Sequence, residues 1–210
     1  MYQAMCADPD DDLRRMRMVL CTGNEGKVAE LRALLPPGIE IIGLAEAGIP
    51  KELPENGHTL VANALEKARF AHERCGLPCL ADDTGLEVDA LNGDPGVRSA
   101  RYAGEAKCAA ANMQRLLNEM EGATDRSARF RTVIAWVSRA DEQVFEGMVE
   151  GTIALAPRGS GGFGYDPVFI PVGSTLTFAE MDVEAKNRIS HRARAVEKAV
   201  AFLRSRYGVR

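Results

Sequence analysis

Short apolar runs recur along the chain, and polar segments with helical spacing of apolar residues lie between them. Such runs are typical of β-strands that bury one or both faces. They predict seven strands, at residues 18–21, 39–44, 78–81, 86–88, 130–138, 143–154 and 168–170. Only residues 139–142 separate the two longest runs, which favours an antiparallel hairpin at that point.

Apolar residues recur at helical spacing in segments 28–35, 109–120 and 193–207. The first segment ends at Pro36, which cannot continue a helix, and Ser190 is a suitable N-cap for the third. Strands that alternate with helices and include one hairpin favour an α/β fold built on a mixed sheet.

The chain has 210 residues, of which 46% are hydrophobic and 27% charged, so a single globular unit over 17–210 is expected. Residues 1–16 combine four aspartates with two arginines and predict a disordered, solvated tail. No apolar stretch approaches the roughly 18 residues of a membrane span, and the acidic start is unlike a signal peptide. We therefore expect a cytoplasmic protein with no membrane partner.

The net charge of −4 argues against general binding to nucleic acid, which requires a concentrated basic surface. The cysteines are odd in number and scattered, and they lack the second pair that a zinc site needs. They are predicted to be reduced thiols: Cys6, Cys21, Cys75, Cys79 and Cys108.

Two adjacent carboxylates, Asp82 and Asp83, follow the run 78–81 and are predicted to lie at the end of a buried strand. A desolvated carboxylate is costly unless a cation or hydrogen-bond donors meet it, and a divalent metal is a natural partner. The alternative is an acidic turn in which Asp82, Asp83 and Thr84 cap the main chain.

A second group of polar residues surrounds the helix that carries Asn63 and Lys67, which are four positions apart and share one face. Glu55 lies just outside this helix and, with Asp83, offers the oxygen ligands that Mg²⁺ prefers. The alternatives are that Glu55 complements the helix dipole and that Lys67 is a surface lysine.

The segment after the first predicted strand combines glycines with polar residues and opens a helix. A helix N-terminus with a nearby lysine can bind phosphate, although the spacing matches neither a P-loop nor a dinucleotide fingerprint. The alternative is an ordinary Thr or Asn helix cap with an exposed lysine. The residues concerned are Thr22, Gly23, Asn24, Glu25, Gly26 and Lys27.

Two further blocks suggest recognition of a nucleobase. Phe163 is flanked by glycines and followed by Asp166, so the ring is suited to stacking and the carboxylate to accepting a hydrogen bond. Lys186, His191 and Arg192 gather donors around the start of the last helix. The alternatives are a turn with Phe163 in the core, and a solvated basic helix end.

Taken in order, these blocks resemble the inosine triphosphate pyrophosphatase family, whose members hydrolyse deaminated purine nucleoside triphosphates. The resemblance covers about residues 17–207. It implies an elongated mixed sheet in two lobes with the active site in a central cleft, and a homodimer. The segments that carry it are 22–30, 55–68, 81–86, 95–104, 162–167 and 190–192.

The resemblance also implies a reaction, in which water attacks the α-phosphorus of ITP, dITP or XTP and releases pyrophosphate and the nucleoside monophosphate. Asp83 would be the proton acceptor, Glu55 and Asp83 would bind Mg²⁺, and Asp82 would support them. The implied substrate-binding residues are Thr22, Gly23, Asn24, Glu25, Gly26, Lys27, Asn63, Lys67, Thr84, Phe163, Gly164, Tyr165, Asp166, Lys186, His191 and Arg192.

The family often has Phe, Ser and Tyr where this chain has Leu60, Thr84 and Arg98, and none of these departures removes a charged group that the mechanism needs. Two other functions stay open: a related pyrophosphatase that acts on modified pyrimidine nucleotides, and a non-catalytic module that senses a nucleotide. The blocks at 162–167 and 190–192 speak against the first, and the intact carboxylates against the second.

Overall fold

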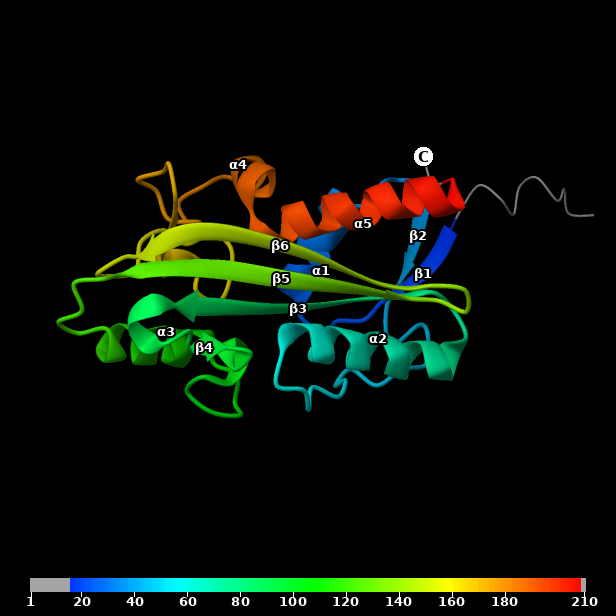
Figure 1. Cartoon of the computed structure of the whole chain (residues 1–210), viewed down its shortest axis with the longest axis horizontal. Coiled ribbons are helices and arrows are strands. Elements are labelled where there is room, and N and C mark those ends of the chain that lie inside the picture. The colour runs from blue at the N-terminus through cyan, green and yellow to red at the C-terminus, as the bar shows by residue number, and fades with distance from the viewer. Residues whose placement is uncertain (1–15, 209–210) are drawn as a thin grey trace, which may run out of the picture.

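The computed structural model describes residues 16–208, which form one seven-stranded mixed sheet flanked by helices (Figure 1). The path through the sheet is β2-β1-β3-β5-β6-β7, and β4 pairs with β3 beside this path. The predicted fold class is confirmed. The strands are β1 (Met16–Leu20), β2 (Ile39–Ile42), β3 (Cys79–Val88), β4 (Pro95–Gly96), β5 (Ser127–Val137), β6 (Glu142–Ile153) and β7 (Phe169–Pro171).

Helices cover both faces of the long central strands, with α1 and α5 on one side and α2 and α3 on the other (Figure 1). Separate apolar clusters lie under α2 and under α5, so each face of the sheet has its own core. The helices are α1 (Glu25–Leu34), α2 (Leu60–Cys75), α3 (Ala109–Glu119), α4 (Val183–Ile189) and α5 (His191–Tyr207).

Side-chain caps fix where the helices near the pocket begin. The Oδ1 atom of Asn24 accepts a hydrogen bond from the main-chain N–H of Lys27 at 3.1 Å and starts α1. Thr59 caps α2 in the same way, and Ser190 caps α5, as predicted. Each cap satisfies an N–H group that has no partner within its helix.

The strand β3 corrects the prediction that Asp82 and Asp83 lie at a strand end. The runs 78–81 and 86–88 belong to one continuous strand, and both carboxylates lie in its middle, where β5 pairs along its length. The strand continues because cationic side chains from other elements meet the carboxylates, so no turn is needed to expose them to water.

The opposite edge of β3 has a gap. The parallel strand β1 pairs only with Cys79 and Leu80, and β4 joins only at Leu86 and Glu87. Within the described part of the chain no strand pairs with residues 81–85 on this edge. Since β1 ends here and α1 begins, this is the kind of switch point at which α/β proteins bind ligands.

The remaining differences from the predicted elements are short. The patterns did not predict β4 or α4, because elements of two and seven residues show no periodicity. Residues 1–15 of the predicted tail lie outside the described residues, and Met16 is the first residue of β1. The predicted hairpin is confirmed as β5 and β6.

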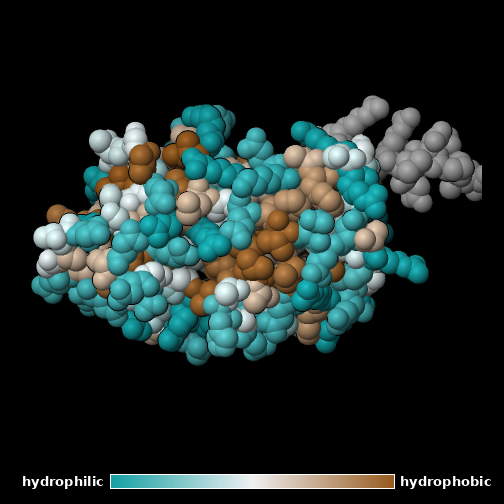
Figure 2. All heavy atoms as spheres, in the orientation of Figure 1, coloured by the Kyte–Doolittle hydropathy of each residue, from teal (hydrophilic) through white to brown (hydrophobic). Residues whose placement is uncertain are grey.

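Four cysteines in the described region are free thiols, in agreement with the predicted reduced state, and Cys6 lies outside that region. Among residues 16–208 no helix has the length and apolar character to cross a membrane. Polar side chains cover most of the face in Figure 2, and apolar side chains are exposed over the middle of the long strands.

Candidate active site

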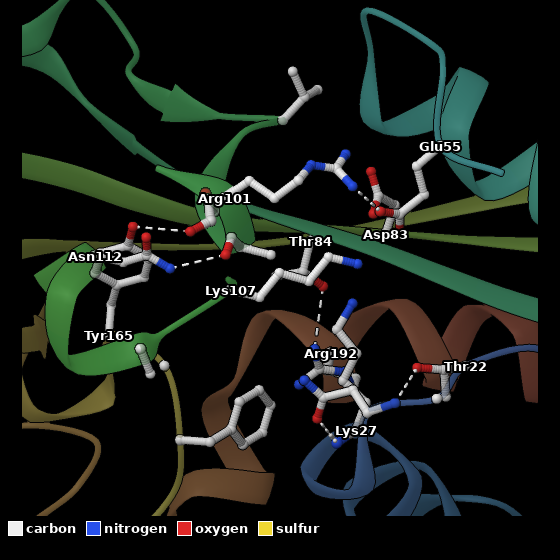
Figure 3. Close-up of a pocket in the computed structure, with 18 of the residues that line it drawn as sticks. Thr22, Lys27, Glu55, Asp83, Thr84, Arg101, Lys107, Asn112, Tyr165 and Arg192 are labelled. Carbon is white, nitrogen blue, oxygen red and sulfur yellow. Dashed lines mark hydrogen bonds and ion pairs between the residues drawn. The ribbon is translucent and has the colours of Figure 1, made fainter. Parts of the chain in front are cut away.

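A pocket of about 570 Å³ opens beside the unpaired edge of β3 (Figure 3). It gathers most of the predicted site residues from five separate segments of the chain. Those that line it are Thr22, Gly23, Asn24, Lys27, Glu55, Lys67, Asp83, Thr84, Phe163, Gly164, Tyr165, Asp166, Lys186, His191 and Arg192. The pocket lining does not include Glu25, Gly26, Asn63 or Asp82.

Lys67 joins the two carboxylates that were predicted to bind metal. Its Nζ atom lies 3.0 Å from Oδ1 of Asp83 and 2.8 Å from Oε1 of Glu55. Asn63, one turn earlier on α2, donates to Oδ2 of Asp83 at 3.3 Å. Lys67 is buried, so the alternative of a surface lysine is wrong.

The proton affinities of these three groups are coupled. Burial raises the pKa of Asp83, although the ammonium group of Lys67 opposes the rise. Burial also acts to raise the pKa of Glu55, but Lys67, Lys27 and Arg101 together outweigh it and the pKa falls. Burial disfavours the charged form of Lys67, but Asp83 and Glu55 prevail and raise its pKa. Asp83 is thus the more basic carboxylate beside a lysine that keeps its proton.

Asp82 points to the other face of β3, because adjacent strand residues alternate. Its Oδ1 lies 3.2 Å from Nζ of Lys27, and its Oδ2 lies 3.2 Å from Nη2 of Arg192. Thr84 donates to the same Oδ2 atom at 3.2 Å. Burial would raise the pKa of Asp82, but Lys27 and Arg192 lower it strongly, so it remains a carboxylate. The alternative of an acidic turn is wrong.

The start of α1 faces the pocket with a half-buried cation, Lys27. Thr22 accepts a hydrogen bond from the main-chain N–H of Asn24 at 3.2 Å, which shapes the turn before the helix. Burial lowers the pKa of Lys27, although Asp82 opposes the change. The alternative of an exposed lysine is therefore wrong, since both the Lys27 side chain and the helix N-terminus are directed to the site.

The glycines of this turn make room for side chains. A Cβ atom on Gly26 would lie 2.6 Å from Cδ1 of Phe163, and one on Gly23 would lie 2.9 Å from Cγ of Lys51. These glycines lie in a segment that the sequence predicts can bind phosphate. The structure shows that they let the ring of Phe163 and the stem of Lys51 pack closely against the main chain.

Phe163 stands half-buried in the pocket, where its ring packs against Gly26 of α1, and it is not part of the apolar core clusters. Its main-chain N–H donates to Oδ2 of Asp166 at 2.7 Å, and the same oxygen accepts from Nζ of Lys186 at 2.6 Å. Nζ of Lys186 lies 5.2 Å from the centre of the ring. Burial raises the pKa of Asp166 despite Lys186. This carboxylate fixes the turn that presents the ring.

His191 and Arg192 are buried at the start of α5, so the alternative of a solvated basic helix end is wrong. The imidazole of His191 stacks on Phe130 with ring centres 4.6 Å apart, and burial holds its pKa well below the usual range. Its Nδ1 has no hydrogen-bond partner among the described residues. Glu30 accepts from both Arg192 and Lys186 and links the two cations.

Several pocket residues were missed because polar residues in loops resemble ordinary surface residues. Arg101 donates to Oε2 of Glu55 at 3.1 Å, although segment 95–104 was noted only for its family resemblance. Thr132, which lies in β5 outside the pocket lining, supports the site from behind: its hydroxyl is 2.7 Å from that of Thr84, directly across the β3–β5 pair. The other lining residues not predicted include Lys51, Ser99, Lys107 and Asn112.

The donor set of Glu55 and Asp83 fits a hard cation that binds together with phosphate. Within residues 16–208 no group of three or more His, Cys, Asp or Glu side chains could hold a metal by itself. Mg²⁺ usually takes one or two carboxylates and completes its shell with water and substrate phosphates. Glu55 and Asp83 supply these two carboxylates at the pocket wall.

Comparison with known proteins agrees with this arrangement. The model of the Ham1 family matches residues 18–202. A curated protein named dITP/XTP pyrophosphatase from Porphyromonas gingivalis is 54% identical over 188 residues, which is 89% of this chain and 97% of that protein. A protein of the same name from Methylococcus capsulatus is 48% identical over 200 residues, covering 92% and 99% of the two chains.

Solved structures agree as well. The HAM1 protein from Coxiella burnetii is similar with a TM-score of 0.83 and 42% identity, over 90% of this chain and 99% of that chain. The Ham1 protein from Staphylococcus aureus has a TM-score of 0.82 and 39% identity, over 90% and 98%. The family resemblance drawn from the sequence motifs is confirmed, and this chain belongs to the Ham1 family.

Proposed function

We propose that this protein hydrolyses dITP, ITP and XTP to the nucleoside monophosphate and pyrophosphate. The observation that carries the proposal is that one pocket combines Asp83, Lys67 and Glu55 at one end with Phe163 and His191 at the other. The first end suits a triphosphate and the second a nucleobase. The curated relatives named dITP/XTP pyrophosphatase support this substrate class.

Discrimination between nucleobases would take place at the aromatic end. The Phe163 ring offers a stacking face, and Lys186 and Arg192 lie beside it as cationic donors. The 6-oxo group of hypoxanthine or xanthine accepts hydrogen bonds, whereas the 6-amino group of adenine does not. A buried donor left unpaired by the wrong base can cost about 10⁴-fold in rate. This chemistry favours the deaminated purines over adenine.

At the other end, positive charge would stabilise the leaving pyrophosphate. The N-terminus of α1, Lys27 and Lys67 lie around the triphosphate end of the pocket. A Mg²⁺ ion held by Glu55 and Asp83 would add positive charge beside the phosphates and lower the pKa of water. Asp83, whose pKa is raised by burial, would accept the proton of the attacking water.

A panel of nucleotides with pyrophosphate detection tests the proposal. We expect pyrophosphate from dITP, ITP and XTP at least about a hundredfold faster than from dATP or dGTP. EDTA should abolish turnover and added Mg²⁺ restore it. Faster hydrolysis of modified pyrimidine nucleotides would favour the first alternative enzyme, and nucleotide binding without any turnover would favour a sensing module.

We further propose that residues 17–210 act as one domain, with two lobes on either side of the pocket, in a cytoplasmic homodimer. The free thiols suit a reducing compartment, and the apolar area over the long strands in Figure 2 suits a protein contact. The net charge of −4 gives no reason to expect a nucleic acid partner. Light scattering after gel filtration would test the dimer, since a monomer mass contradicts it.

A further inference from the structure

Arg101 connects the two walls of the pocket. It lies in the short turn Ser99–Arg101, and its Nη1 donates to Oε2 of Glu55, in the loop before α2, at 3.1 Å. Figure 3 shows the Arg101 side chain extending across the pocket towards Glu55 and Asp83. Because Glu55 is also the proposed metal ligand, Arg101 and a metal ion would compete for the same carboxylate.

This ion pair is the easiest in the pocket to exchange. The side chains of Arg101 and Glu55 each keep 24% of their surface exposed, whereas Arg192 keeps 1%. Arg101 has a single ion-pair partner among residues 16–208, whereas Arg192 contacts two carboxylates. Partly exposed ion pairs with one partner contribute little to stability, because water competes for both charges.

The main chain beneath Arg101 is held firmly. The hydroxyl of Tyr165 donates to the carbonyl oxygen of Ser99 at 2.9 Å, and Asn112 donates to that of Ala100 at 2.9 Å. The turn is therefore fixed by two other segments, while the guanidinium group has only one side-chain partner within the described part of the chain. A fixed main chain with a loosely held side chain allows a change of partner without movement of the fold.

The charges of the pocket give Arg101 a second partner when ligand binds. Lys27 and Lys67 are already paired with buried carboxylates, so they neutralise only part of the charge of a triphosphate. A guanidinium group binds phosphate oxygens through paired hydrogen bonds. A metal ion on Glu55 would release Arg101 at the same place where the phosphates need a further cation.

We infer that Arg101 exchanges partners during binding: without ligand it holds Glu55, and with metal and triphosphate bound it contacts the phosphates while Glu55 turns to the metal. This inference rests on the proposed function only in that the ligand is a nucleoside triphosphate with a divalent cation. No covalent bond changes in this step.

Two binding measurements on Arg101→Met test the exchange without turnover. Mn²⁺ affinity in the absence of nucleotide, measured by electron paramagnetic resonance, should become about two- to fivefold tighter, because Glu55 loses a competitor. The affinity for α,β-imido-ITP, which cannot be cleaved between the α- and β-phosphates, should become about tenfold weaker in calorimetry at saturating Mg²⁺, because a phosphate contact is lost. Tighter Mn²⁺ binding together with weaker nucleotide binding identifies the exchange, since the loss of a purely structural role would weaken both affinities.

Arg98→Met is the matched control. Arg98 belongs to the same segment as Arg101, and its substitution by Met removes the same charge. However, Arg98 does not line the pocket and forms no ion pair in the described region. It should leave both affinities within about twofold of wild type. Arg101→Lys keeps the charge without the paired donors and should lie between wild type and Arg101→Met. Thermal unfolding checks that each variant is folded.

The exchange is overturned if Arg101→Met weakens both affinities or changes neither, or if Arg98→Met reproduces its effects. The failure of the proposed function is a separate result. If the wild type released no pyrophosphate from any nucleotide, the reaction would be wrong, while the two affinities would still decide whether Arg101 changes partner.

Discussion

Asp82 and Asp83 are consecutive residues of β3, yet the pKa values of their carboxyl groups shift in opposite directions on the two faces of the strand. Asp82 is enclosed between Lys27 and Arg192, which hold its pKa far below the usual value. Asp83 faces α2 and the pocket, and burial raises its pKa although Lys67 is close. The difference comes from the number of cations that each face supplies.

This comparison separates two tasks. A carboxylate shared by two buried cations is valuable to the fold, because its removal leaves both cations unpaired. A carboxylate with a raised pKa is a better proton acceptor, because its basicity is closer to the working pH. Strand alternation thus lets one dipeptide serve stability on one face and chemistry on the other.

The largest expected effect is the loss of turnover in Asp83→Asn. Pyrophosphate release from ITP should fall by about 10²- to 10⁴-fold, because an amide cannot take the proton of water. ITP affinity should stay within a few-fold of wild type, since the phosphate and base contacts remain. The assay is pyrophosphate release at saturating ITP. More than a tenth of wild-type activity would break the proposed division of tasks.

Asp82→Asn should instead mainly affect stability. The free energy of unfolding should fall by about 3–5 kcal/mol, because Lys27 and Arg192 lose their shared carboxylate. Denaturant titration at pH 7 measures this loss, with Asp83→Asn as the matched control. Equal losses in the two variants would contradict the comparison.

The contribution of Asp82 to the free energy of unfolding should also appear in the wild type when its stability is measured as a function of pH. The folded-state pKa of Asp82 lies below its ordinary value of 3.8. Its contribution to the free energy of unfolding is therefore present above pH 3.8 and is lost as the pH falls further.

Lys67→Met tests the Asp83 side of the comparison through the pH profile of kcat/KM. Because Lys67 lowers the pKa of Asp83 against the effect of burial, its removal should raise that pKa further. The acid limb of kcat/KM should then move to higher pH by about one unit. Lys51→Met removes an ammonium group from the pocket that has no ion pair among residues 16–208, and should leave the limb in place. A limb shifted to lower pH would contradict the assignment.

The smallest expected effect is that of Thr132→Val. The Thr132 hydroxyl is fully buried and supports Thr84, which donates to Asp82. Its loss should lower the free energy of unfolding by about 1 kcal/mol. The acid limb should not move, because the change lies on the Asp82 face. Thr132→Ser keeps the hydroxyl and should recover most of the stability in the same denaturant titration.

The sequence predicted those parts of the fold in which local pattern and tertiary structure agree. The hairpin of β5 and β6 follows from two long apolar runs with a short link, and α5 begins beside the predicted cap Ser190. The pattern of apolar residues did not predict that β3 is one continuous strand. The partners of Asp83 and Asp82 include Lys67, 16 positions away, and Arg192, 110 positions away, and local spacing contains no information on either contact.

The same limit applies to the site. Phe163 was a recognisable candidate because glycines surround it, and most of the predicted residues do line one pocket. Arg101 was not recognisable, because an arginine in a loop has the same appearance whether it faces water or Glu55, 46 positions earlier. Its importance depends on which wall of the pocket lies opposite, and that is a property of the folded chain.

The close packing of Gly26 under Phe163 links the first turn of α1 to the aromatic side of the pocket. A single methyl group at position 26 would push the aromatic ring and reshape the space for the nucleobase without replacing a side chain that faces the ligand. Laboratory selection for a changed range of nucleotides would therefore gain from libraries that vary this backbone position together with the aromatic loop.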